Sequence, residues 1–161
     1  MTYKEFLETK IELATESGFV VDPEKVSKVL KPHQRDAVVW ALKGGRRALF
    51  ESFGLGKTVQ EIEFCHLASE HSGGRALIVL PLGVKQEFTH DAVEVLGYEK
   101  PEYCRTMEEV EQSTSQIVLT NYERVRDGDI RPDYFAATSL DEASVLRSFG
   151  SKTYQTFLDK F

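Results

Sequence analysis

The chain has 161 residues, 41% of them hydrophobic and 29% charged, which is the composition of one soluble globular domain. No apolar run approaches the ~20 residues of a membrane span, and the charged N-terminus lacks the apolar core of a signal peptide. We therefore expect a cytoplasmic protein that does not associate with a membrane. The net charge of −6 argues against a bulk attraction to nucleic acid, although a local basic groove is compatible with it.

The N-terminal part of the chain is predicted to be helical. Apolar residues at helical spacing predict an amphipathic helix over residues 2–17, and the proline-containing stretch 19–32 is predicted to be a connector. A second helix is predicted over 33–43, because the pair Gly44 and Gly45 that follows is a common stop signal.

Strands and helices alternate in the rest of the chain. The predicted elements are a short strand at 47–50, a helix at 57–71, a buried strand at 76–81, a helix at 84–97, a surface helix with a turn at 107–116, a buried strand at 116–121, a strand at 135–140 and two closing helices. This alternation predicts an α/β fold in which a parallel sheet carries helices on both faces.

The stretch ESFGLGKTVQ at 51–60 places Gly-Lys-Thr between a predicted strand and a predicted helix. Glycines ahead of a helix let backbone N–H groups approach a phosphate, a lysine adds positive charge, and a threonine hydroxyl binds Mg²⁺. The glycine that usually opens such a loop is replaced by Glu51. On this segment alone, a phosphate site and an ordinary strand-to-helix turn are equally open.

Four further blocks favour the phosphate site. They are LKPHQRDAVVWAL at 30–42, ALIVLPLGVKQEF at 76–88, IVLTNYERV at 117–125 and LDEASVLRSFGSKT at 140–153. In this order and spacing they resemble the first motor domain of superfamily-two helicases and translocases, most of all the Swi/Snf branch, and the last block is most similar to helicase-like proteins of bacteriophages and prophages. In that branch an acidic residue stands where the first glycine is missing, so Glu51 supports the resemblance.

The resemblance implies a RecA-like P-loop NTPase fold over 30–161 as a single lobe, preceded by a helical extension and connector at 1–29. It implies ATP and Mg²⁺ as cofactors. Gln34 would read the adenine edge, because an amide both donates and accepts, and Phe19 is a weaker candidate for stacking on the base. The nucleotide-binding set that follows from the phosphate loop is Gly54, Leu55, Gly56, Lys57 and Thr58.

The same resemblance assigns the acidic motif and a nucleic-acid edge. Asp141 would hold Mg²⁺ together with Thr58, and Glu142 would orient the attacking water, so that Lys57, Asp141 and Glu142 form the catalytic set. An Asp-Glu pair that caps the following helix is the plain structural alternative. The residues expected along the backbone of DNA are Pro81, Thr120 and Asn121, with Lys85, Arg124 or Arg126 adding charge.

Two residues or segments depart from the family pattern. The predicted strand 135–140, FAATSL, is more polar than a central strand should be, and Thr138 and Ser139 need hydrogen-bond partners if they are buried. Ser144 stands where many relatives carry a histidine that couples hydrolysis to the next motif.

The expected function is that of the ATP-binding lobe of a DNA-dependent ATPase of helicase-like type. The family's second motor domain, which supplies transition-state arginines, is not within the 161 residues, so we expect weak or no hydrolysis by this lobe alone. A second domain on another chain or in a missing C-terminal region is the expected partner, and a bacterial host cell is the expected location if the gene belongs to a phage.

Three other functions are alternatives to this one. The first is a binding module that keeps the helicase-like lobe without turnover and acts through protein or nucleic-acid contacts. The second is a P-loop kinase, which the blocks at 30–42, 76–88 and 117–125 oppose. The third is a zinc site at Cys65, His66 and His71, whose spacing does not match a closed four-ligand set.

Overall fold

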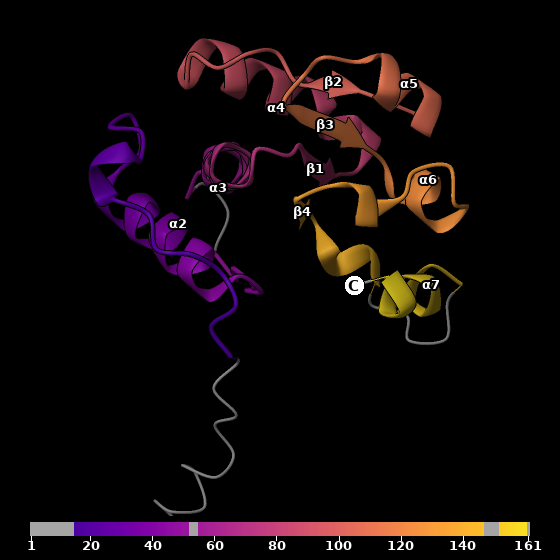
Figure 1. Ribbon diagram of the computed structural model, residues 1–161, viewed down its shortest axis with the longest axis horizontal. Helices are drawn as coiled ribbons and strands as arrows, with labels where there is room; N and C mark the ends of the chain where they lie inside the picture. The colour runs from indigo at the N-terminus through magenta and orange to yellow at the C-terminus, as the bar shows by residue number, and fades with distance from the viewer. Residues whose placement is uncertain (1–14, 52–54, 147–151, 161) are drawn as a thin grey trace, which may run out of the picture.

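The structure is a computed structural model that describes residues 15–51, 55–146 and 152–160. Within these residues the chain forms one sheet of four parallel strands, in the order β2-β3-β1-β4 (Figure 1). The strands are β1 (Ala76–Val79), β2 (Glu102–Tyr103), β3 (Ile117–Thr120) and β4 (Ala137–Leu140). The α/β class and the parallel sheet that the alternation predicted are therefore confirmed.

Helices cover both faces of this sheet. One face carries α3, with α2 packed outside it, and the helix α4 that continues into the π-helical turn η3; the other face carries α5, α6 and α7 (Figure 1). Their bounds are α2 (Pro32–Gly44), α3 (Lys57–Ser72), α4 (Lys85–His90), η3 (Asp91–Val95), α5 (Met107–Gln112), α6 (Tyr122–Arg126) and α7 (Lys152–Lys160). Short 3₁₀ turns connect them: η1 (Pro23–Lys25), η2 (Leu82–Val84), η4 (Pro132–Tyr134) and η5 (Ala143–Leu146).

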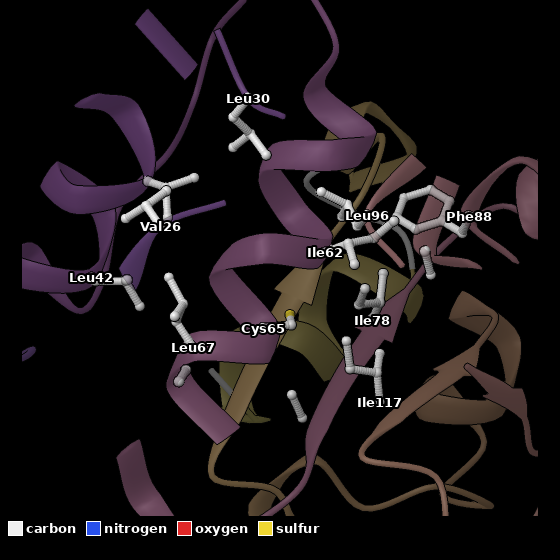
Figure 2. Packing of buried hydrophobic residues seen from close by; sticks show 14 of the residues in the cluster. Val26, Leu30, Leu42, Ile62, Cys65, Leu67, Ile78, Phe88, Leu96 and Ile117 are labelled. Carbon is white, nitrogen blue, oxygen red and sulfur yellow. The ribbon is translucent and has the colours of Figure 1, made fainter. Parts of the chain in front are cut away.

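The central strand β1 divides the core in two. Its four residues are all buried, and because side chains alternate along a strand, Ile78 packs toward α3 while Leu77 and Val79 pack toward α6 and α7. Figure 2 shows Ile62 and Cys65 of α3 beside Ile78 on the first of these faces. The continuous apolar run at 76–81 thus buries both faces of a strand, as predicted.

The strand predicted at 47–50 is wrong. These residues have no regular secondary structure, and Leu49 and Phe50 are 38% and 97% exposed. A strand needs a partner for its backbone groups, and none of the described strands pairs with this segment. On the β4 side the described sheet ends at β4 itself, whose residues are only partly buried.

Residues 2–14 of the helix predicted at 2–17 lie outside the described residues, and so do residues 147–151. None of the helices in the described ranges is long and apolar enough to span a membrane.

Candidate functional site

The segment predicted as a phosphate loop, residues 51–58 and called the phosphate loop below, ends its non-helical part at a left-handed glycine. Gly56 has φ +71° and is the N-cap of α3, so that Lys57 is the first helical residue, as the sequence predicted. A Cβ on Gly56 would lie 2.4 Å from Nε2 of Gln34. The left-handed conformation therefore favours glycine here, and a side chain would also displace the Gln34 amide. Gly54, the other predicted glycine, lies outside the described residues.

Lys57 and Thr58 are held by neighbouring oxygen atoms. Nζ of Lys57 donates to the backbone carbonyl of Glu51 at 3.4 Å, and the hydroxyl of Thr58 donates to Oε1 of Glu87 at 3.0 Å. Glu87 belongs to α4, so the first turn of α3 is joined to the helix that follows β1. An acidic partner for Thr58 was not anticipated from the sequence.

Gln34 lies in the site but faces the protein. The residue is 6% exposed, Oε1 accepts from the backbone N–H of Lys31 at 2.8 Å, and Nε2 donates to the carbonyl of Leu55 at 2.7 Å. The side chain therefore joins the start of α2 to the phosphate loop. Reading an adenine edge would require one of these bonds to be exchanged. Phe19 stacks on His71 instead, with ring centroids 3.7 Å apart.

Asp141 and Glu142 follow the carboxyl end of β4. The backbone N–H of Asp141 donates to the carbonyl of Val79 at 2.8 Å, and the hydroxyl of Tyr122 donates to the carbonyl of Asp141 at 2.6 Å. Glu142 has φ +53°, an uncommon conformation for a residue with a side chain. The hydroxyl of Ser144 lies 3.3 Å from Oε2 of Glu142, where it donates to the carboxylate.

Burial and neighbouring charges shift the pKa values of two carboxyl groups in this region, Asp141 and Glu61. Burial raises the pKa of Asp141 above its ordinary value, the charge of Glu142 raises it further, and the ammonium of Lys57 lowers it. Lys57 lowers the pKa of Glu61 as well. Lys57 is thus close enough to Asp141 and Glu61 for its charge to affect both carboxyl groups, while the roles that the sequence predicted for Lys57 and Asp141 stay predictions.

Glu61 is a carboxylate of this site that the sequence did not reveal. Burial raises its pKa from 4.5 to about 8, a hydrogen bond with Ser139 opposes the rise, and the charge of Asp141 adds to it. Its Oε1 atom is buried without a hydrogen-bond partner in the described part of the chain. Ser139 was expected to need a hydrogen-bond partner if buried. The polarity of the predicted strand 135–140 is therefore a sequence feature that indicated a buried polar partner, without identifying it as Glu61.

The residues predicted for a nucleic-acid edge gather at the carboxyl ends of β1 and β3, but with different exposure. Thr120 is fully buried, and its hydroxyl donates to the carbonyl of Cys104 at 2.9 Å, which ties β3 to the end of β2. Asn121 accepts from the hydroxyl of Tyr103 at 2.9 Å. The ammonium of Lys85 lies 5.0 Å from the centre of the Tyr103 ring. Tyr103 is thus the centre of this edge, and the sequence did not single it out.

The two arginines considered for the same edge are engaged by acidic neighbours. Arg124 is paired with Asp129 at 3.0 Å, and Arg126 with Asp127 at 2.9 Å. Two hollows of about 500 and 800 Å³ lie beside β2 and share Glu102 and Tyr103 as a wall, on the side of the sheet opposite β4. Neither is lined by a residue of the phosphate loop.

No group of three or more metal-ligating side chains converges in the part of the chain that the structure describes. Cys65 is buried in the core, and the His66 ring contacts Gln116 at 3.0 Å and stacks on Tyr98. His71 stacks on Phe19, as noted.

Solved structures with a similar fold are helicase and ATPase motor domains. The UvsW helicase from bacteriophage T4 matches with a TM-score of 0.66 and 17% identity, over 99% of this chain and 56% of that one. The SWI2/SNF2 ATPase core of Sulfolobus solfataricus, solved in complex with dsDNA, matches with a TM-score of 0.65 and 17% identity, over 86% of this chain and 31% of that one.

The chain matches no protein-family model and no curated protein. It spans about half the length of the UvsW chain and about a third of the SWI2/SNF2 core. At this identity the likeness concerns the fold. The chain has the α/β fold of a helicase motor domain, with a parallel sheet flanked by helices.

Proposed function

We propose that this chain is the ATP-binding lobe of a DNA-dependent ATPase of helicase-like type. The observation that carries the proposal is geometric: Lys57 opens α3 directly after a left-handed glycine, and Asp141 directly follows β4, where its backbone N–H donates to Val79 of β1 at 2.8 Å. In open parallel sheets, ligands bind at the carboxyl ends of the strands. Asp141 directly follows β4, and Thr58, next to Lys57, donates to Glu87 of α4, the helix that follows β1.

The residues present suit a magnesium nucleotide. α3 has 16 residues and begins at a left-handed glycine, so its first backbone N–H groups and its positive end suit a phosphate. Lys57 supplies a cation. Thr58 and Asp141 supply the hydroxyl and carboxylate oxygens that Mg²⁺ prefers. We propose that the nucleotide draws Lys57 from the carbonyl of Glu51 and Thr58 from Glu87.

The proposed role of each residue follows from its charge and its neighbours. Bound Mg²⁺ would neutralise developing charge on the phosphates. Lys57 would hold the β- and γ-phosphates, and Asp141 would orient the metal. Glu142, beside Asp141 and in contact with Ser144, would orient and polarise the attacking water. Gln34 would contribute to adenine recognition only after exchanging its bond to Leu55 or Lys31.

We further propose that turnover requires a second motor domain. In related NTPases an arginine that stabilises the transferring phosphoryl group is worth ~10³–10⁵ in rate. Lys57, Asp141 and Glu142 alone would bind the nucleotide and hydrolyse it slowly. The domain division at residue 30 remains part of this proposal.

DNA is the proposed nucleic-acid partner, by analogy with the SWI2/SNF2 core that was solved with dsDNA. Pro81, Asn121 and Lys85 lie at the strand ends where contacts to the backbone would form. Thr120 would act indirectly, because its buried hydroxyl fixes the end of β2.

Calorimetric titration with Mg-ATP tests the nucleotide proposal. The wild type should bind, Lys57→Ala should lose binding, and Lys100→Ala, which removes an exposed lysine beside β2, should bind as the wild type does. Undetectable binding by the wild type would overturn the proposal and favour a helicase-like module that acts through protein or nucleic-acid contacts.

A further inference from the structure

Gln60, near the start of α3, has a buried side-chain amide that contacts the phosphate loop. It is 1% exposed, and its Nε2 lies 2.8 Å from Oε2 of Glu51 and 3.3 Å from the carbonyl oxygens of both Leu55 and Gly56. All three neighbours are acceptors, which fixes this end of the amide as the nitrogen. One side chain thus contacts both the beginning and the end of the loop.

The carbonyl of Leu55 is held by two amides. Besides Gln60, Nε2 of Gln34 donates to it at 2.7 Å. The structure contains no cis peptide bond in its described residues, and in a trans peptide the carbonyl and the following N–H point in opposite directions. The two buried glutamines therefore turn the N–H of Gly56 away from themselves, as an anion-binding loop requires.

Glu51 is the anchor of this arrangement. It stands where a phosphate loop usually has its first glycine, and its carboxylate accepts from Gln60 while its carbonyl accepts from Lys57. A hydrogen bond to a charged acceptor is stronger than one between neutral groups. The acidic residue thus ties the start of the loop to the first turns of α3.

The other end of the Gln60 amide works against stability. Oε1 is buried and has no hydrogen-bond partner in the part of the chain that the structure describes, which costs folding free energy. An apolar side chain of similar length would avoid that cost. The benefit of the amide is in its nitrogen, which contacts only the loop.

We propose that Gln60 is a positioning residue for the triphosphate of a nucleotide: anchored by Glu51, it orients the Leu55–Gly56 peptide toward the anion and replaces the missing first glycine. The inference rests on the proposed nucleotide-binding function. Gln60 contacts no ligand in this arrangement and acts through the loop alone.

The test compares Mg-ATP affinities by calorimetry. Gln60→Met, which keeps the length and removes the amide, should bind about tenfold more weakly than the wild type, because tenfold corresponds to about 1.4 kcal/mol. The matched control is Gln112→Met, since Gln112 is exposed and its amide donates to Glu108 at 3.3 Å, away from the loop. Its affinity should be that of the wild type.

Glu51 variants separate positioning from general destabilisation. Glu51→Ala should weaken binding as Gln60→Met does, and the double variant should be no weaker than either single one, because both remove the same bond. Glu51→Gln should recover most of the affinity, since its amide oxygen also accepts. Thermal melts should show that all variants are folded. If Gln60→Met does not fold, the comparison of Glu51→Ala with Glu51→Gln carries the test, because Glu51 is only partly buried.

The outcomes are distinguishable. Wild-type binding that Lys57→Ala abolishes, but that Gln60→Met and Glu51→Ala leave unchanged, overturns the positioning role and leaves the proposed function intact. Additive losses in the double variant also contradict it. No binding by the wild type overturns both.

Discussion

The hydroxyl of Tyr122 donates to the backbone carbonyl of Asp141 across 2.6 Å, which joins α6 to the end of β4. Tyr122 is 5% exposed, and its ring packs on Phe157 of α7 at 5.3 Å between centroids. Burial raises the pKa of its phenol, so the hydroxyl keeps its proton at neutral pH and remains a donor. The backbone of the acidic motif is thus fixed from the opposite face to α3.

Tyr122→Phe should destabilise the fold by about 1 kcal/mol, the typical value of one hydrogen bond, because the ring still packs but the carbonyl loses its donor. Urea unfolding checks the stability. The Mg²⁺ concentration needed for half-maximal ATP binding should also rise, since Asp141 is less well held. Tyr134→Phe, at an exposed ring, is the control. An unchanged Mg²⁺ requirement would show that Tyr122 is structural only.

Glu61 should make stability depend on pH in a defined direction. Its pKa is raised from 4.5 to about 8, chiefly by burial, so between these values the folded protein keeps a proton that the unfolded chain releases. The free energy of unfolding therefore falls as pH rises through this window, by roughly 1.4 kcal/mol per unit at most, and the loss is complete above pH 8.

Glu61→Gln removes this titration. Relative to the wild type, the variant should be progressively more stable as pH rises from 4.5 to about 8, and the difference should stay constant beyond that. Urea unfolding at several pH values measures it, with Glu111→Gln as an exposed control. A difference that does not vary with pH would mean that Glu61 titrates normally.

Gly56→Ala should abolish nucleotide binding and destabilise the protein. The substituted residue would need φ near +71°, and its Cβ would meet Nε2 of Gln34 at 2.4 Å. The left-handed conformation alone costs about 1–2 kcal/mol for a residue with a side chain. Gly97→Ala is the control, because Gly97 has φ +70° but no atom within 4 Å of its Cβ position. If both variants bind Mg-ATP equally, crowding at Gly56 is unimportant.

A buried hydrogen-bond network around Glu63 of α3 should contribute to stability. Glu63 is fully buried and accepts from the backbone N–H of Ser27 at 2.7 Å and from the hydroxyl of Tyr98 at 2.5 Å. Tyr98→Phe keeps the stacking on His66 but removes the hydroxyl, so it should cost about 1–3 kcal/mol, the range for leaving a buried polar group without its hydrogen bond. Denaturant unfolding measures the loss; a variant as stable as the wild type would contradict the assignment.

The sequence was sufficient for the elements whose signal is local. The apolar run at 76–81 predicted a strand buried on both faces, and the glycines at 44–45 and 73 predicted helix ends at α2 and α3. The two-residue strand β2 escaped prediction because it is too short for any periodicity, and α6 because its five residues follow a strand directly. The strand predicted at 47–50 was wrong because local propensity does not supply a partner strand.

The motifs predicted site residues, but they did not predict contacts between residues that are distant in sequence. The roles of Lys57 and Asp141, which the motifs predicted, stay predictions. The motifs did not predict Glu61, because a glutamate on a helix is ordinarily solvent-exposed and its hydrogen-bond partner Ser139 lies 78 positions further along the chain. The contact of Gln34 with Leu55 is of the same kind, since only the tertiary fold brings α2 to the loop.

The most direct test of the account is the Mg²⁺ dependence of ATP binding in Asp141→Asn and Lys57→Ala. If both side chains face one magnesium triphosphate, Lys57→Ala should lose affinity with and without Mg²⁺, while Asp141→Asn should lose only the part that Mg²⁺ adds and should match the wild type in EDTA. Asp133→Asn, at an exposed site, should behave as the wild type. An Asp141→Asn variant that binds Mg-ATP as tightly as the wild type would contradict the central claim.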